Sequence, residues 1–225
     1  METVQEVIKK IREKKSTGQM SQTTYNEPIL VNNIEEKNEL SDFGIPKRHW
    51  NVTWEWLRSN NRSKDVDAFK QAREYSDNID ANIKKGTGLI LKGGVGVGKT
   101  SVAVAIMRDC IDKGYRPYFI SSLHMLDKIY SLKDSKYELR ALEDKLTGTK
   151  LLVLDDLGAE SSVEWVNIKV MSILAKRYDD MLPIIATTNL ANDDIKGKYD
   201  VRTYDRLKAM CKVIKVEGES LREGV

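Results

Sequence analysis

From residue 86 onward, short apolar runs alternate with longer stretches whose apolar positions recur at helical spacing. The runs are typical of buried strands and lie at 88–92 (GLILK), 117–121 (PYFIS), 150–156 (KLLVLDD), 183–189 (PIIATTN) and 211–218 (CKVIKVEG). Helical periodicity follows at 100–113, from 122 to 146, at 161–179 and at 198–209. Strands that alternate with helices of this length imply a parallel sheet. We therefore predict an α/β fold on a five-stranded parallel sheet with flanking helices.

The region before residue 86 is less regular and predicts an extension followed by the start of a domain. Residues 2–15 have helical apolar spacing, and residues 16–29 are polar and turn-rich, as in a linker. Residues 43–57 hold three of the four tryptophans, which indicates a packing collar, and 63–84 predicts a helix with Ser63 as N-cap. We expect a short helical N-terminal extension over 1–42, which either packs on its own domain or docks a partner, and a catalytic domain over 43–225.

Composition narrows the class of protein. A net charge of +3 is too small to bind nucleic acid by bulk electrostatics, so any such contact needs a local patch. With two cysteines and two histidines we expect no zinc site, and Cys110 and Cys211 read as small core residues in a reducing compartment. Because no apolar run approaches the ~20 residues of a membrane span and the first residues lack a signal peptide's apolar core, we expect a cytoplasmic protein with no membrane contact.

The stretch GGVGVGKTS carries the strongest chemical signal. Gly93-x-x-x-x-Gly98-Lys99-Thr100 has every fixed position of a phosphate-binding loop, and it follows a strand and opens a helix. Backbone N–H groups of such a loop converge on one anion, and the helix N-terminus faces the same anion. Lys99 would reach the β- and γ-phosphates of ATP, and Thr100 would give its hydroxyl to Mg²⁺. The predicted nucleotide-binding residues are Gly93, Gly94, Val95, Gly96, Val97, Gly98, Lys99, Thr100 and Ser101.

Two adjacent carboxylates end the buried run at 150–156. Ligands bind an open parallel sheet at the carboxyl ends of its strands, where Asp155 and Asp156 should lie. Successive strand side chains point opposite ways, so we expect different roles. Asp155 is the candidate Mg²⁺ ligand, and Asp156 would orient or deprotonate the attacking water. Asn189, which ends the following strand, could hydrogen-bond both that water and the γ-phosphate.

Together these motifs resemble those of a known family. Residues 43–222 are similar to the AAA+ ATPases of the DnaC/DnaI type, the bacterial helicase loaders, and to the related IstB transposition helper ATPases. The resemblance rests on GIPKRHW (44–50), GGVGVGKTSVA (93–103), LLVLDDLGAE (151–160), IIATTNL (184–190), RTYDRL (202–207) and GESLR (218–222). It implies an AAA+ (ASCE-type) P-loop NTPase that hydrolyses ATP.

The resemblance also implies further roles. Asn189 takes the sensor-1 position, Arg206 the arginine finger acting on ATP of a neighbouring subunit, and Arg222 the sensor-2 position in its own subunit. The segment 44–50 would lie near the adenine. The chain departs from most AAA+ proteins in having Asp156 where Glu is usual, so hydrolysis is expected to be slow. The part after Asn189 is too short for the helical lid domain, and the zinc-binding module of some loaders is expected to be absent.

Three functions follow from these expectations. The first is a helicase loader that binds the replicative helicase hexamer, self-assembles on it and places it on single-stranded DNA. The second is an IstB-like regulator that binds duplex DNA and a transposase. The third, a P-loop kinase of a small metabolite, is disfavoured by the Asn189, Arg206 and Arg222 series. The segment 121–145 either lines a single-strand path or is an ordinary amphipathic surface; its basic and aromatic residues are Lys128, Tyr130, Lys133, Lys136, Tyr137 and Arg140.

Overall fold

The computed structural model describes residues 40–60, 66–159, 164–218 and 220. The chain divides into two compact units, Met1–Leu40 and Ser41–Val225, and the sheet with its helices belongs to the second. The predicted helix at 2–15, the linker at 16–29, the Ser63 cap and Arg222 lie outside the described residues.

Five parallel strands form the sheet, in the order β2-β3-β4-β1-β5. They are β1 (Gly88–Lys92), β2 (Tyr118–Ser121), β3 (Leu152–Asp155), β4 (Ile184–Thr188) and β5 (Cys211–Lys215). The predicted five-stranded parallel sheet is therefore confirmed. Because β4 lies between β1 and β3, the residues that follow β4 are placed between those that follow β1 and those that end β3.

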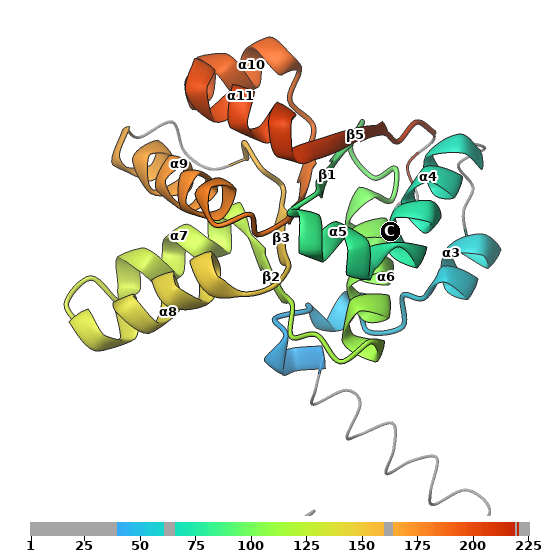
Figure 1. Ribbon diagram of the computed structural model, residues 1–225, viewed down its shortest axis with the longest axis horizontal. Helices are drawn as coiled ribbons and strands as arrows, with labels where there is room; N and C mark the ends of the chain where they lie inside the picture. The colour runs from blue at the N-terminus through green and yellow to red at the C-terminus, as the bar shows by residue number, and fades with distance from the viewer. Residues whose placement is uncertain (1–39, 61–65, 160–163, 219, 221–225) are drawn as a thin grey trace, which may run out of the picture. The chain divides into compact units, whose positions relative to one another are not determined.

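Helices cover both faces of this sheet (Figure 1). On one face, apolar side chains of β2, β3 and β4 pack against α7 (Ser122–Ser131), α8 (Lys136–Gly148), α9 (Glu164–Asp179), α10 (Asn192–Lys198) and α11 (Val201–Met210). On the other face lies α6 (Lys99–Asp112), which has a fully buried stretch from Ala103 to Met107, and α4 (Val66–Asp77) packs on α6. The result is a three-layer α/β/α arrangement with β4 as the central strand and β1 next to it.

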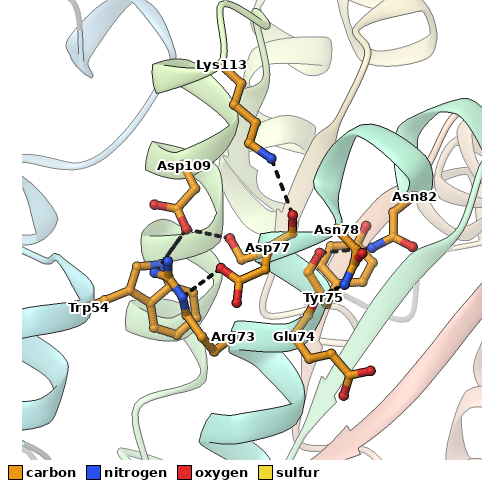
Figure 2. A network of polar contacts seen from close by, with 10 residues as sticks. Trp54, Arg73, Glu74, Tyr75, Asp77, Asn78, Asn82, Asp109 and Lys113 are labelled. Atoms are coloured by element: carbon orange, nitrogen blue, oxygen red, sulfur yellow. Dashed lines mark hydrogen bonds and ion pairs between the residues drawn. The ribbon is translucent and has the colours of Figure 1, made fainter.

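The helix predicted at 63–84 is instead two helices, α4 and α5 (Ile79–Lys85). Asn78 interrupts it with φ −99° and ψ 22°, and its Nδ2 donates to the Glu74 carbonyl at 2.9 Å. The buried Asn82 then donates from Nδ2 to the Tyr75 carbonyl at 2.9 Å (Figure 2). Two asparagine amides thus satisfy backbone groups at the break, which helical periodicity cannot reveal. The region 122–146 is likewise divided, into α7 and α8.

Asp109 on α6 anchors the tryptophan-rich segment. Its Oδ2 accepts hydrogen bonds from Trp54 Nε1 and Ser76 Oγ, both at 2.7 Å, and from Arg73 Nη1 at 3.3 Å (Figure 2). Trp54 begins α3 (Trp54–Asn60), while Arg73 and Ser76 belong to α4. One carboxylate therefore ties α3 and α4 to the helix that follows the phosphate-binding loop.

Arg177 performs a similar task on the opposite face of the sheet. The side chain is fully buried, and it donates from Nη1 to the Leu146 carbonyl at 2.9 Å and from Nη2 to those of Thr149 (2.9 Å) and Pro183 (2.7 Å). Burial lowers the pKa of Arg177 to about 9, so the guanidinium stays charged at neutral pH. It joins the end of α8 to the segment that enters β4.

Both cysteines are free and buried, as predicted for core residues. Burial raises the pKa of each thiol to about 12, for Cys110 on α6 and for Cys211 at the start of β5. Among the described helices, none has the length and apolar character needed to cross a membrane.

Candidate nucleotide-binding site

The loop between β1 and α6 has backbone geometry that glycine permits. Gly96 and Gly98 have φ angles of 82° and 93°, in the left-handed region that other residues rarely adopt. At Gly93, a Cβ would lie 2.0 Å from the Val216 carbonyl oxygen, so the loop passes too close to the segment after β5 for any side chain. The motif glycines therefore let the loop turn back over the start of α6.

Lys99 is buried at the centre of this loop, with 5% of its surface exposed. Its ammonium donates to the carbonyls of Gly93 at 2.9 Å and Gly94 at 2.5 Å, and to Asn189 Oδ1 at 2.5 Å. Asn189 follows β4, so the strand order brings together a lysine and an amide that lie 90 positions apart in the chain. The two residues predicted to contact the terminal phosphate are in direct contact with each other.

Thr100, Asp155 and Thr187 form a second cluster beside the loop. Asp155 is 2% exposed, and its Oδ1 accepts from Thr187 Oγ1 at 2.7 Å and from Thr100 Oγ1 at 2.9 Å. Burial raises the pKa of Asp155, as does the charge of Asp156, while the hydrogen bonds from Thr187 and Thr100 act in the opposite direction. The adjoining hydroxyl and carboxylate are oxygen donors of the kind Mg²⁺ binds, usually one or two per site with phosphates and waters completing the shell.

Asp156 is placed differently from its neighbour. It has a φ of 55°, its N–H donates to Thr187 Oγ1 at 2.9 Å, and its carbonyl accepts from the buried Ser122 Oγ at 2.7 Å. Asp156 lines the cleft next to the loop. Asp155 does not line this cleft and is instead hydrogen-bonded to Thr100. The two carboxylates thus occupy different environments. Thr187 and Ser122, for which we predicted no role, both hydrogen-bond the backbone of Asp156.

The cleft itself has a volume of about 240 Å³. It is lined by Arg48, His49, Val52, Trp56, Val95, Gly96, Gly98, Lys99, Thr100, Ser101, Asp156 and Asn189. Three predicted binding residues are absent from this lining. Gly93 and Gly94 take part through their carbonyls to Lys99, and Val97 is buried, so its side chain belongs to the core.

The segment 44–50 contributes to two neighbouring spaces. Arg48 and His49, in the short helix η1 (Lys47–His49), line the cleft. Gly44 and Pro46 instead line a second cavity, of about 370 Å³, beside Asp155 and Asp156. No local pattern in the sequence predicts a place in the cleft for Val52 and Trp56. Trp56 belongs to α3, which Asp109 holds through Trp54, and Val52 N–H donates to the His49 carbonyl at 3.1 Å.

Arg206 is not among the residues that line the cleft of its own chain. It lies on α11, which packs against α9, and its guanidinium carbon is 5.9 Å from the ring centre of Tyr178. The described part of the chain holds no group of three or more His, Cys, Asp or Glu side chains placed to bind a metal. Thr100 and Asp155 are the residues beside the loop that could hold Mg²⁺ together with phosphate oxygens.

Comparison with known proteins agrees with this geometry. Residues 73–224 match the family of IstB-like ATP-binding proteins. The replicative helicase loader DnaI of Bacillus subtilis is 30% identical over 154 residues, which are 61% of this chain and 48% of DnaI. The IS21 putative ATP-binding protein of Pseudomonas aeruginosa is 27% identical over 147 residues, 63% of this chain and 55% of that protein.

A solved structure shows the same fold. The crystal structure of the DnaC helicase loader superposes with a TM-score of 0.67 at 27% identity, over 76% of this chain and all of that one. The sheet and its helices are thus those of an AAA+ P-loop NTPase. This chain spans about half the length of DnaI and of the IS21 protein.

Proposed function

Because the chain belongs to the family of IstB-like ATP-binding proteins, we propose that it is an ATPase that loads a replicative DNA helicase onto single-stranded DNA. The observation that carries the proposal is the meeting of Lys99, Thr100, Asp155 and Asn189 at one edge of the sheet. The similarity to the helicase loaders DnaI and DnaC supports the choice of partner.

The phosphate loop and Lys99 would bind the β- and γ-phosphates of ATP. The ammonium of Lys99 is now surrounded by three oxygen acceptors, and phosphate oxygens are stronger acceptors for the same three N–H groups. Thr100 and Asp155 would hold Mg²⁺, which neutralises charge on the transferred phosphoryl group when bound.

Asp156 and Asn189 are the candidates for handling the attacking water. Asp156 would accept a proton from the water or orient it, and the Asn189 amide would align water and γ-phosphate. Thr187 and Ser122 hydrogen-bond the backbone of Asp156, so the carboxylate is carried by a backbone that is held in place. A shorter side chain than Glu at this position fits an ATPase that turns over slowly.

Arg206 would act on the nucleotide of a neighbouring subunit when the protein assembles on the helicase hexamer. Its place beside Tyr178, outside its own cleft, supports action in trans. Arg222, which lies outside the described residues, would touch ATP in its own subunit.

Single-stranded DNA would bind along α7 and α8. Tyr130 and Tyr137 expose 59% and 86% of their surfaces, and the ammonium of Lys133 lies 4.7 Å from the ring centre of Tyr130. Exposed aromatic rings beside cations suit base stacking combined with phosphate attraction.

The second candidate function is that of a transposition helper ATPase binding duplex DNA and a transposase. The family match and the 27% identity to the IS21 protein favour it. A capture experiment separates the two: the full chain is immobilised with ATP and Mg²⁺ and offered the purified helicase and, separately, an IS21-type transposase from the same source. Retention of the helicase alone supports the loader, and retention of the transposase alone overturns it.

The nucleotide assignment is tested by Lys99→Ala. The change removes the cation nearest the terminal phosphates, so we expect affinity for a fluorescent ATP analogue to fall at least ~100-fold, in the range given by loss of charge-assisted hydrogen bonds. The circular-dichroism spectrum should be unchanged. Near-normal affinity in a folded Lys99→Ala protein would overturn the assignment of the loop.

A further inference from the structure

Two spaces meet at the carboxylate end of the cleft, and both are lined by Arg48 and Asp156. One is the cleft that holds Lys99, Thr100 and Asn189, and the other is the cavity beside Asp155 that reaches β2 and α7. Arg48 lines both spaces together with Asp156. It therefore lies at the end of the cleft where the terminal phosphate and the attacking water would bind. Val52 and Trp56 line only the first space.

The backbone around Arg48 is fixed on both sides. Before it, Gly44 has a φ of 81° and packs so closely that a Cβ would lie 2.2 Å from the Phe119 carbonyl oxygen, while Phe119 N–H donates to the Phe43 carbonyl at 2.8 Å. After it, the Trp50 carbonyl accepts from Arg108 Nη1 at 3.0 Å. Contacts to β2 and α6 therefore hold η1 in place, although the Arg48 side chain itself is exposed.

The charges that line the cleft indicate a role for Arg48 in binding an anionic ligand. Among the described residues that line it, the permanent positive charges are those of Lys99 and Arg48, and Asp156 carries a negative charge. Lys99 lies on the loop side, in contact with Gly93 and Gly94. ATP adds several negative charges, which Lys99 and one Mg²⁺ leave incompletely balanced. Besides the arginines already assigned to ATP, Arg48 is a described cation that lines the cleft together with Asp156.

We propose that Arg48 binds the γ-phosphate of ATP within its own subunit, closing the cleft from the side of Asp156. The inference rests on the proposed ATP binding and adds a residue outside the loop. It departs from the expectation that the segment 44–50 lies near the adenine, because Arg48 lines the same two spaces as Asp156. Arg48 Nε donates to His49 Nε2 at 3.0 Å, which restrains the guanidinium plane, and its Nη1 and Nη2 would donate to the phosphate. A planar guanidinium can donate two parallel hydrogen bonds to one phosphate, which a lysine cannot. Arg48 would then make the cleft prefer ATP to ADP.

The test compares affinities for Mg²⁺-ADP and for the Mg²⁺ complex of a β,γ-methylene ATP analogue. Arg48→Gln should weaken binding of the ATP analogue about 10- to 100-fold and leave ADP affinity within about twofold, the range expected for charge-assisted hydrogen bonds to one group. Arg48→Lys should recover part of the loss, since it keeps the charge but not the paired hydrogen bonds. The matched control is Lys47→Gln on the same short helix, because Lys47 lies over the Trp50 ring, lines neither space, and should change neither affinity.

Each contrary outcome has a distinct meaning. An equal loss for both nucleotides overturns the proposal by placing Arg48 on the base, ribose or inner phosphates. Unchanged affinities in Arg48→Gln overturn it by showing no contact with nucleotide. In both cases Lys99→Ala still reports on the loop, so failure of Arg48 is distinguishable from failure of the proposed ATP binding.

Discussion

At the scale of single residues, Thr187 shows how one hydroxyl can serve two adjacent carboxylates. Its Oγ1 donates to Asp155 at 2.7 Å and accepts from the Asp156 N–H at 2.9 Å. It is fully buried in β4, between the strand of the phosphate loop and the strand of the carboxylates. Both the pKa of one aspartate and the backbone direction of the other therefore depend on it.

We predict that Thr187→Val lowers ATP hydrolysis about tenfold and moves its acidic limit to higher pH. The change removes a hydrogen bond that lowers the pKa of Asp155, so that pKa rises further above its ordinary value. In the proposed function Asp155 holds Mg²⁺ in its ionised form, so we expect activity to be lost at a higher pH than in the unchanged protein as the pH falls. The loss of one hydrogen bond to a charged group corresponds to about 1.5–3 kcal/mol. The measurement is the ATPase rate between pH 5 and pH 8.

Thr188→Val is the matched control for this prediction. The Thr188 hydroxyl donates to the Leu157 carbonyl at 2.7 Å and is as buried as that of Thr187, but it contacts neither carboxylate. It should cost comparable stability without moving the pH profile. A pH profile of Thr187→Val that coincides with the one for Thr188→Val would show that Asp155 does not depend on Thr187.

At the scale of elements, Arg177 holds a helix end to the sheet. The three carbonyls it binds come from α8, from the turn before β3 and from Pro183, the residue before β4. Arg177→Met fills similar volume but removes the donor of the Leu146 and Thr149 carbonyls, at about 1–3 kcal/mol each. The Pro183 carbonyl keeps the hydrogen bond from the Leu152 N–H at 3.3 Å. We expect a loss of at least about 3 kcal/mol and a drop in Tm of about 6–12 °C by thermal unfolding.

Its neighbour provides the comparison. Lys176 forms an exposed ion pair with Asp180 at 2.7 Å on the same turn of α9. Because exposed pairs contribute little, Lys176→Met should change the Tm by no more than about 2 °C. Equal changes in Tm for the two substitutions would mean that the buried guanidinium of Arg177 contributes no more to stability than an exposed lysine on the same helix.

Most strands and helices were predictable because each has its own local pattern. The five apolar runs became five strands with small shifts of boundary, as at β3, which covers Leu152–Asp155 within the predicted 150–156. Helix α10 was not predicted, because NDDIKGK has a single buried apolar residue, Ile195. It forms where the Asp194 carboxylate accepts from the Ala191 N–H at 3.1 Å, which is local capping rather than periodicity.

The candidate site was predictable where its residues are adjacent in the chain. Lys99 and Thr100 follow the glycine motif directly, and Asp155 ends a strand. The resemblance placed the segment 44–50, and with it Arg48, near the nucleotide, but no local pattern placed Trp56 in the cleft. Helix α3 is positioned by tertiary contacts, among them the hydrogen bond of Trp54 to Asp109 and the packing of Trp54 on Phe69. Tertiary contacts of this kind have no signal in a single sequence.

At the scale of the whole molecule, the role proposed for Arg206 would make one chain an incomplete enzyme. Arg206→Ala should leave ATP affinity of the isolated chain unchanged, because Arg206 does not line its own cleft. In the assembled state we expect hydrolysis to fall by ~10³-fold, the contribution of arginine fingers in other phosphoryl-transfer enzymes. The measurements are equilibrium nucleotide binding and ATPase rate in the presence of the helicase.

Mixing subunits makes the test sharper. Arg206→Ala supplies a working loop without the finger, and Lys99→Ala supplies the finger without a working loop. Titrating one variant against the other should restore part of the ATPase activity. If no ratio restores activity although both variants co-assemble, Arg206 acts within its own subunit or only packs on Tyr178.

The order of the strands also decides when, during synthesis, the site can first exist. β1 leaves the ribosome first, but its neighbours are β4 and β5, with Leu89 opposite Ile185 and Lys212. A nascent chain complete only through α9 has a phosphate loop whose strand is unpaired on both sides. Translation must pass Asn189 before Lys99 meets its amide partner. A chain truncated before β4 should therefore bind no nucleotide. A truncated messenger RNA would then not produce protein fragments that bind ATP without hydrolysing it.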